Sequence, residues 1–106
     1  MVIMEYKVKS YNLSDIKQQM VNIAGLRMTY SARKGMFELG FNNKDAVNAI
    51  QGIKDSDFYK SMTTNNNHKL WQDVYRTLYK GVMLYIKFQQ DSDGYFTISF
   101  KELNNE

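Results

Sequence analysis

The first long stretch of the chain repeats its apolar residues at the spacing of a helix. This period predicts an amphipathic helix that begins at Asn12 or Ser14, both favourable N-cap types, and ends at Gly25. A short segment over 27–30 then has the composition of a β-strand. The apolar stripe of the predicted helix consists of Ile16, Met20, Ile23 and Ala24.

Two further helices are predicted in the same half of the chain. The second opens at Ser31 and closes at Gly40, because glycine commonly follows the end of a helix. The third is capped by Asn42 or Asn43. Each carries one apolar stripe and is therefore expected to cover a core. The stripe residues are Ala32, Met36 and Leu39 in the second helix, and Ala46, Val47, Ile50 and Ile53 in the third.

The second half of the chain changes to a period of two, which is typical of half-buried β-strands. Residues 82–89 and 95–101 alternate apolar and polar side chains. The polar segment 90–94 between them predicts a hairpin with a five-residue loop. The apolar face of this hairpin consists of Val82, Leu84, Ile86, Phe88, Phe96, Ile98 and Phe100.

The alternation restricts the register of this hairpin. Even-numbered residues should face even-numbered ones, because a slip of one residue would turn the apolar set towards solvent. A five-residue loop pairs Phe88 with Phe96 and Tyr85 with Ser99, whereas a shift of two residues puts Lys101 directly opposite Tyr85. Both registers are compatible with the pattern. In either case one polar face carries Tyr85, Lys87 and Lys101.

Two more strands are predicted before the hairpin, over 57–63 and 71–79. The second of them has apolar residues on both sides, which is typical of a central strand partly covered on both faces. Its Gln72 and Arg76 share one side. The predicted fold is α+β, with N-terminal helices packed on an antiparallel sheet, in a single domain over 1–106.

Composition excludes several kinds of site. The chain has 106 residues, no cysteine and a single histidine, His68, so thiolate metal sites, disulfides, cysteine nucleophiles and multi-histidine zinc sites are excluded. We expect no metal and no cofactor. The net charge of +3 permits an anionic partner. The apolar run at 1–4 is too short for a signal peptide and no segment approaches the roughly 20 apolar residues of a membrane span, so the expected location is the cytoplasm.

Several polar residues of the second half could together act on a phosphodiester. RNA carries its own nucleophile in the 2′-hydroxyl, so a metal-free ribonuclease needs a proton acceptor, a cation for the phosphate oxygens and a proton donor. Lysine is ordinarily charged at neutral pH, so Lys60 is expected to stabilise the phosphate, and Tyr85 is the better group for moving a proton. The same residues could also form a base-stacking platform or an ordinary sheet surface. The candidates are Lys60, His68, Gln72, Arg76, Tyr85, Lys87 and Lys101.

The order of these residues resembles the signature of the MqsR family of toxins. Residues 56–64 read SDFYKSMTT, His68 follows, and residues 71–76 read WQDVYR. Residues 81–87 and 99–102 continue the resemblance. It implies a type II toxin with the RelE-like fold, an mRNA interferase that cleaves messenger RNA at GCU-containing sites and arrests growth. It also implies neutralisation by a cognate MqsA-like antitoxin, a zinc-binding protein, so that the zinc belongs to the partner.

The resemblance also assigns roles to individual residues. Members of the family have Lys60, Gln72 and Tyr85 at the positions proposed for catalysis, with Lys101 close by, and all four residue types are retained here. Departures lie elsewhere in the chain and bear on substrate preference and antitoxin contacts. They are the loop 65–67, the stretch 77–79 and the N-terminal arm through Tyr11.

The resulting hypothesis is a metal-independent endoribonuclease that leaves a 2′,3′-cyclic phosphate and a 5′-hydroxyl. Lys60 and Arg76 would hold the phosphate, Gln72 would orient it and Tyr85 would move a proton. His68 would assist or close the loop, and Lys101 would join His68 and Arg76 in binding substrate. Two alternatives stay open: a non-catalytic module that binds RNA or the ribosome, and an inactivated toxin that serves as an antitoxin-binding scaffold.

Overall fold

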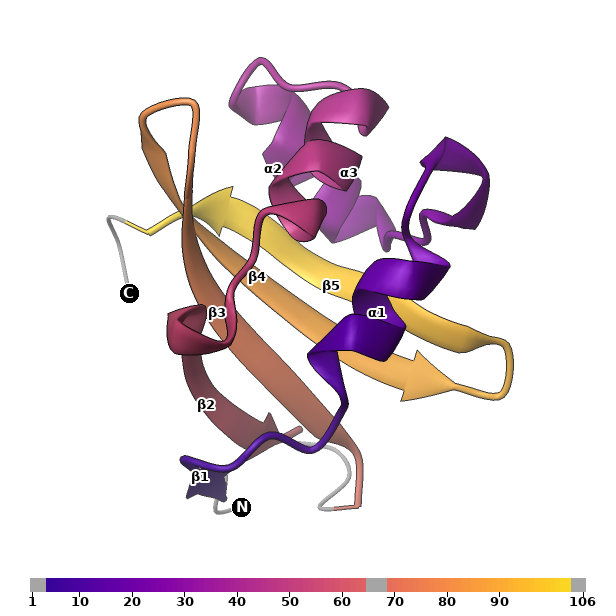
Figure 1. Ribbon diagram of the computed structural model, residues 1–106, viewed down its shortest axis with the longest axis vertical. Helices are drawn as coiled ribbons and strands as arrows, with labels where there is room; N and C mark the ends of the chain where they lie inside the picture. Colours follow the sequence, from indigo (N-terminus) through magenta and orange to yellow (C-terminus); the bar gives the residue numbers. More distant parts are fainter. Residues whose placement is uncertain (1–3, 65–68, 104–106) are drawn as a thin grey trace.

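The computed structural model describes residues 4–64 and 69–103 of the chain. Three helices lie on one face of a strongly twisted antiparallel sheet of five strands (Figure 1). This arrangement confirms the predicted α+β class, with helices first and most of the sheet after them. The helices are α1 (Leu13–Gln19), α2 (Tyr30–Glu38) and α3 (Asn43–Gln51), and the strands are β1 (Glu5–Tyr6), β2 (Phe58–Thr63), β3 (Trp71–Tyr79), β4 (Val82–Asp91) and β5 (Gly94–Glu102).

The first helix begins where the sequence predicts and ends earlier. The Asn12 side chain accepts hydrogen bonds from the backbone N–H groups of the first turn, as an N-cap does. The helix stops at Met20, so the predicted end at Gly25 is wrong. The reason is a second cap: Asn22 accepts from the Gly25 N–H and starts a short 3₁₀ turn there. Ile23 in that turn is exposed rather than buried.

The other two helices follow their predicted stripes. Thr29 caps α2, which begins at Tyr30, one residue before the predicted Ser31, and Gly40 lies just beyond its end with φ of +79°. Asn42 caps α3 in a reciprocal pair of hydrogen bonds with Asp45. The predicted strand over 27–30 is reduced to one parallel bridge, between Met28 and Thr97. Buried helix residues include Ile16, Met20, Ala32, Met36, Ala46, Ala49 and Ile50.

Helix α2 packs directly on the backbone of β5. A Cβ atom built on Gly35 would lie 2.1 Å from the carbonyl oxygen of Phe100, far inside van der Waals contact. Any side chain at position 35 would therefore push the helix away from the strand. The close approach fixes α2 next to the part of β5 that precedes Lys101.

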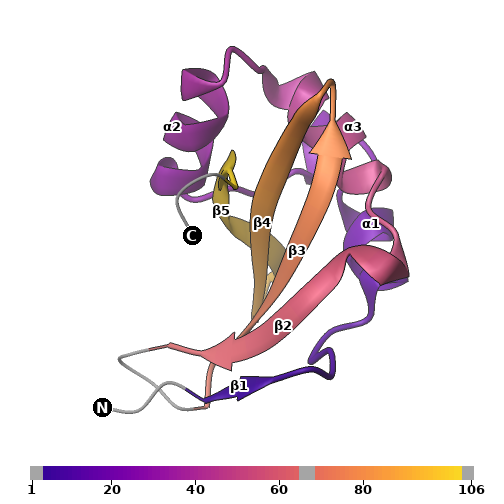
Figure 2. The same ribbon diagram turned by 90° about the vertical axis from the view of Figure 1, so that its left-hand side faces the viewer.

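The sheet order is β1-β2-β3-β4-β5, with β3 central as predicted. Figure 2 shows β1 lying along the outer side of β2, at the end of the sheet away from α2. The predicted five-residue hairpin loop is wrong, because β4 and β5 continue until Asp91 pairs with Gly94 and leaves a turn of two residues. Gly94 has φ of +120°, a conformation that favours glycine.

The β4–β5 register settles the choice between the two predicted pairings. Tyr85 pairs with Lys101, so the register shifted by two residues is the correct one. Nearer the turn the pairing changes, and Phe96 lies opposite Gln89 rather than opposite Phe88. A β-bulge that leaves Ile98 without a partner reconciles the two parts of the hairpin. Even-numbered residues therefore face even-numbered ones only on the side of the bulge away from the turn, where 84–87 pair with 99–102.

Among the described residues, no helix combines the length and the apolar character that crossing a membrane requires.

Candidate active site

The sheet face opposite the helices carries the predicted polar residues. Side chains at Tyr75, Ile86 and Phe100 pack with the helices in the core, so their neighbours along each strand point the other way. We call the surface formed by these outward residues the open face. It includes Lys60 and Met62 of β2, Gln72, Val74 and Arg76 of β3, Tyr85, Lys87 and Gln89 of β4, and Ser99 and Lys101 of β5.

The strand register arranges these residues in rows across the sheet. One row consists of Lys60, Val74, Lys87 and Ser99, and the next consists of Arg76, Tyr85 and Lys101. With strands ~4.8 Å apart and rows ~6.8 Å apart, the Cα atoms of Lys60 and Tyr85 are separated by about 12 Å. Both side chains are long, so their ends can reach one phosphodiester between them.

Tyr85 lies beneath two lysines. The ammonium nitrogens of Lys87 and Lys101 lie 5.7 Å and 5.1 Å from the centroid of its ring, close enough for cation–π attraction. The residue is 5% exposed. Tyr85, for which proton transfer is predicted, is therefore surrounded by cations and covered by flexible side chains.

Lys60 is held by an acid of the N-terminal arm. Its Nζ donates to Oε2 of Glu5 at 2.7 Å, and its side chain is 16% exposed. The Lys60 ammonium lowers the pKa of the Glu5 carboxyl, so the carboxylate is ionised at neutral pH. An RNA phosphate that used Lys60 would have to compete with Glu5.

We expect Glu5→Gln to strengthen RNA binding by up to about fivefold. The ion pair is partly exposed, and such pairs change an equilibrium by a factor of about five at most, which limits how strongly Glu5 competes with RNA for Lys60. The measurement is the affinity for a 2′-O-methylated RNA, which cannot be cleaved by its own 2′-hydroxyl, at fixed salt. Asp15→Asn is the control, since it removes one negative charge from an exposed position on the helical side. Equal gains in both variants would show that net charge alone is responsible.

Arg76 and Gln72 differ in how the structure places them. The Arg76 guanidinium carbon lies 3.5 Å from the centroid of the Tyr59 ring, and Arg76 pairs with Tyr85 across the strands. Gln72 donates from Nε2 to Gln89 Oε1 at 3.0 Å. Four residues of strand separate it from Arg76, about 13 Å. The structure thus brings Arg76, Tyr85 and Lys101 together and leaves Gln72 two rows away.

The predicted contribution of His68 lies outside the described residues. Within 4–64 and 69–103, no three acidic, histidine or cysteine side chains are grouped as a metal site would require. Sequence reasoning missed Glu5 and Tyr59. Glu5 belongs to a strand of two residues, too short to show a period, and Tyr59 reaches the open face only through an irregularity in β2.

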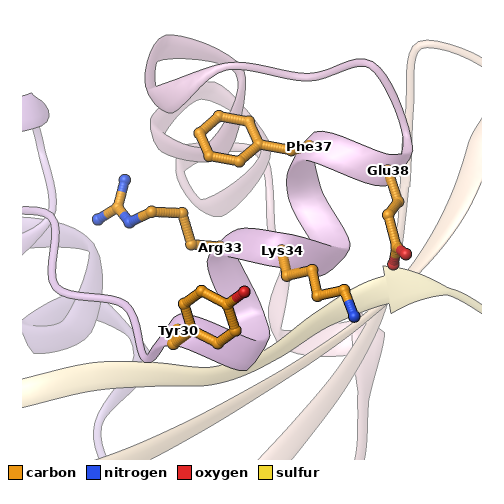
Figure 3. Close-up of a pocket in the computed structure, with 5 residues that line it drawn as sticks. All are labelled: Tyr30, Arg33, Lys34, Phe37 and Glu38. Carbon is orange, nitrogen blue, oxygen red and sulfur yellow. The ribbon is translucent and has the colours of Figure 1, made fainter.

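A separate hollow of about 310 Å³ lies on α2, away from these residues. Figure 3 shows its five lining side chains, all from that one helix, with Tyr30 and Phe37 contributing rings. None of them is a predicted site residue, and the rows that contain Lys60 and Arg76 are on other elements. A second hollow, also of about 310 Å³, runs between α2 and β5 and is lined in part by Lys101. The open face therefore remains the best candidate for chemistry.

The sequence is similar to known toxins. A family model described as "Motility quorum-sensing regulator, toxin of MqsA" matches residues 9–102. The mRNA interferase toxin MqsR of Escherichia coli (strain K12) is 40% identical over 99 residues, which cover 93% of this chain and 99% of the relative. The family match begins after β1, so Glu5 lies before the matched part. With a match over this much of its length, the chain belongs to the MqsR family of toxins.

Proposed function

We propose that this protein is an endoribonuclease toxin that cleaves messenger RNA and is neutralised by an MqsA-like antitoxin. The family description and the name of the E. coli relative support the activity and the partner. The observation that carries the proposal for this chain is the placement of Lys60, Arg76 and Tyr85 in adjacent rows of one sheet face. A messenger RNA substrate implies the cytoplasm as the place of action.

The proposed reaction needs only the RNA, water and the open face. The RNA 2′-oxygen attacks the neighbouring phosphorus, the bond from phosphorus to the 5′-oxygen breaks, and a 2′,3′-cyclic phosphate remains. The positive charges of Lys60 and Arg76 lie beside the non-bridging oxygens and stabilise the negative charge that develops as the pentacoordinate phosphate forms. The 2′-hydroxyl loses its proton to water, Tyr85 donates its phenolic proton to the departing 5′-oxygen, and the resulting phenolate then takes a proton back from water.

RNA binding would uncover Tyr85. Lys87 and Lys101 now lie over its ring, and lysine side chains reorient easily because their stems have four rotatable bonds. Backbone phosphates would draw the two ammonium groups outwards and open a path to the hydroxyl. In this scheme Lys101 binds substrate and also controls access.

Gln72 would orient the reacting phosphate from the side of Lys60. It lies one strand and one row from Lys60, with Cα atoms about 8 Å apart, and about 13 Å along β3 from Arg76. Its partner Gln89 gives this part of the open face two amide side chains that can recognise base edges. This position makes Gln72 a candidate determinant of the GCU preference that the family resemblance implies.

The test is cleavage of a GCU-containing messenger RNA by the purified protein in EDTA. We expect fragments ending in 2′,3′-cyclic phosphate and beginning with a 5′-hydroxyl, and we expect an MqsA-like antitoxin to suppress them. Cleavage that appears only when a divalent cation is restored would reject the metal-free mechanism. RNA that is bound but uncut would favour a non-catalytic binding module. RNA that is neither bound nor cut would favour an antitoxin-binding scaffold.

A further inference from the structure

Three cations surround the ring of Tyr59 in β2. The Arg76 guanidinium carbon lies 3.5 Å from the ring centroid, the Lys7 ammonium 4.7 Å and the Lys60 ammonium 5.1 Å. Lys7 also donates to the Tyr59 backbone carbonyl at 3.3 Å. We call Lys7, Tyr59, Lys60 and Arg76 the Tyr59 cluster. It joins the N-terminal arm, β2 and β3 at one point of the open face.

A β-bulge places Tyr59 there. Phe58 pairs with Tyr75 and packs its ring in the core, whereas Lys60 pairs with Val74 on the open face. The register shifts between the two, so Tyr59 has no partner on β3. In a regular strand Tyr59 and Lys60 would point to opposite faces. The bulge instead turns both side chains towards Arg76.

The Tyr59 ring, rather than a hydrogen-bond acceptor, holds the Arg76 guanidinium. Within the part of the chain that the structure describes, Arg76 has no hydrogen-bond acceptor, and its Nε is buried without a partner. A guanidinium packed against an aromatic face keeps its other N–H groups, those of the two terminal nitrogens, available in its own plane, as a pair that matches two phosphate oxygens. The negative face of the ring also offsets repulsion among three like charges.

We propose that Tyr59 is a positioning residue that holds Arg76, with Lys60 and Lys7 beside it, as a preformed binding site for an RNA backbone phosphate. The proposal rests on the proposed function for its ligand and goes beyond it by assigning a role to Tyr59 and Lys7. Arg76 occupies one face of the Tyr59 ring, and the Lys7 and Lys60 ammonium groups lie 4.7 Å and 5.1 Å from its centroid. We therefore assign Tyr59 to holding Arg76 rather than to stacking on a base.

A double-mutant cycle on Tyr59 and Arg76 tests this role through the affinity for 2′-O-methylated RNA across a range of salt concentrations. We expect Arg76→Ala to weaken binding about tenfold and Tyr59→Leu about fivefold. Each should reduce the salt dependence, because a phosphate contact on single-stranded RNA contributes a slope of about 0.7. In the Arg76→Ala background, Tyr59→Leu should cost no more than about twofold. Tyr59→Phe, which keeps the ring, should bind within about twofold of the unaltered protein.

Other outcomes overturn the inference. If Tyr59→Leu still weakens RNA binding by about fivefold in the Arg76→Ala background, Tyr59 contacts RNA directly. A loss in Tyr59→Phe would assign the effect to the hydroxyl. Tyr30→Leu is the matched control, since Tyr30 is 83% exposed on α2. If Tyr59→Leu does not fold, Arg76→Lys replaces it: the charge remains but the planar stack is lost, and binding that stays unchanged contradicts the proposal.

This experiment separates the inference from the proposed function. Binding of an uncleavable RNA reports on the Tyr59 cluster whether or not the protein cuts RNA. Cleavage by the unaltered protein together with unchanged binding in Tyr59→Leu would reject the role of Tyr59 alone. Binding that depends on Tyr59, without cleavage of ordinary RNA, would reject the nuclease mechanism alone. An unaltered protein that binds no RNA would reject both.

Discussion

Tyr85→Phe is expected to lower the rate of RNA cleavage at saturating substrate by about 10²–10⁴-fold, the contribution typical of a positioned proton donor. The substitution keeps the ring beneath Lys87 and Lys101 and removes only the hydroxyl. Binding of 2′-O-methylated RNA should therefore change little. The measurement is a single-turnover cleavage assay with a labelled GCU-containing RNA, run beside thermal unfolding of the same variant.

A matched substitution separates the chemistry from the change of residue type. Tyr30→Phe removes a hydroxyl from an exposed position on α2 and should cleave at the rate of the unaltered protein. If folded Tyr85→Phe retains cleavage within a few-fold, Tyr85 is not the proton donor. The role would then have to pass to another residue of the open face.

Asp73→Asn is expected to lower the free energy of unfolding by about 2–4 kcal/mol. Asp73 is fully buried, and its two carboxylate oxygens accept the backbone N–H groups of Ser10 and Tyr11 at 2.9–3.1 Å. Hydrogen bonds to a charged group contribute roughly 1.5–3 kcal/mol, and an amide would direct its own N–H groups towards these donors. Urea unfolding followed by circular dichroism measures the loss. Asp93→Asn, in the exposed hairpin turn, should stay within about 0.5 kcal/mol.

The same substitution should loosen the N-terminal arm. Asp73 accepts hydrogen bonds from residues that follow β1 in the chain. Glu5 and Lys7 precede those residues, and they contact Lys60 and Tyr59 respectively. Asp73→Asn should therefore alter the salt dependence of RNA binding at temperatures where the sheet is still folded. A variant as stable as the unaltered protein would show that the buried carboxylate is not needed to hold the arm.

Local patterns predicted those parts of the fold whose causes are local. The caps at Asn12 and Asn42 depend on one side chain and the adjacent turn, and both are where the sequence places them. Alternation assigned Tyr85, Lys87 and Lys101 to one face, and Gln72 and Arg76 to one side of their strand, because parity requires only a continuous strand. The family signature then indicated which of these polar residues to examine for chemistry.

The features that sequence reasoning missed depend on distant contacts. The bulges at Tyr59 and Ile98 arise from pairing with the neighbouring strands, which cannot be inferred from the sequence of the bulged strand alone. The early end of α1 depends on Asn22 capping a new turn while the apolar period continues past it. The Glu5–Lys60 ion pair joins residues 55 positions apart, and no local pattern reports it.

The contact between Gly35 and the Phe100 carbonyl has a practical consequence for genetics. In a selection for cells that survive expression of the toxin, every replacement of Gly35 should appear among the survivors, because the helix cannot seat on the last strand. Such clones would resemble those with a damaged reactive group, although position 35 touches no RNA in the proposed mechanism. Measuring the amount of soluble protein in each survivor would separate the two kinds of clone.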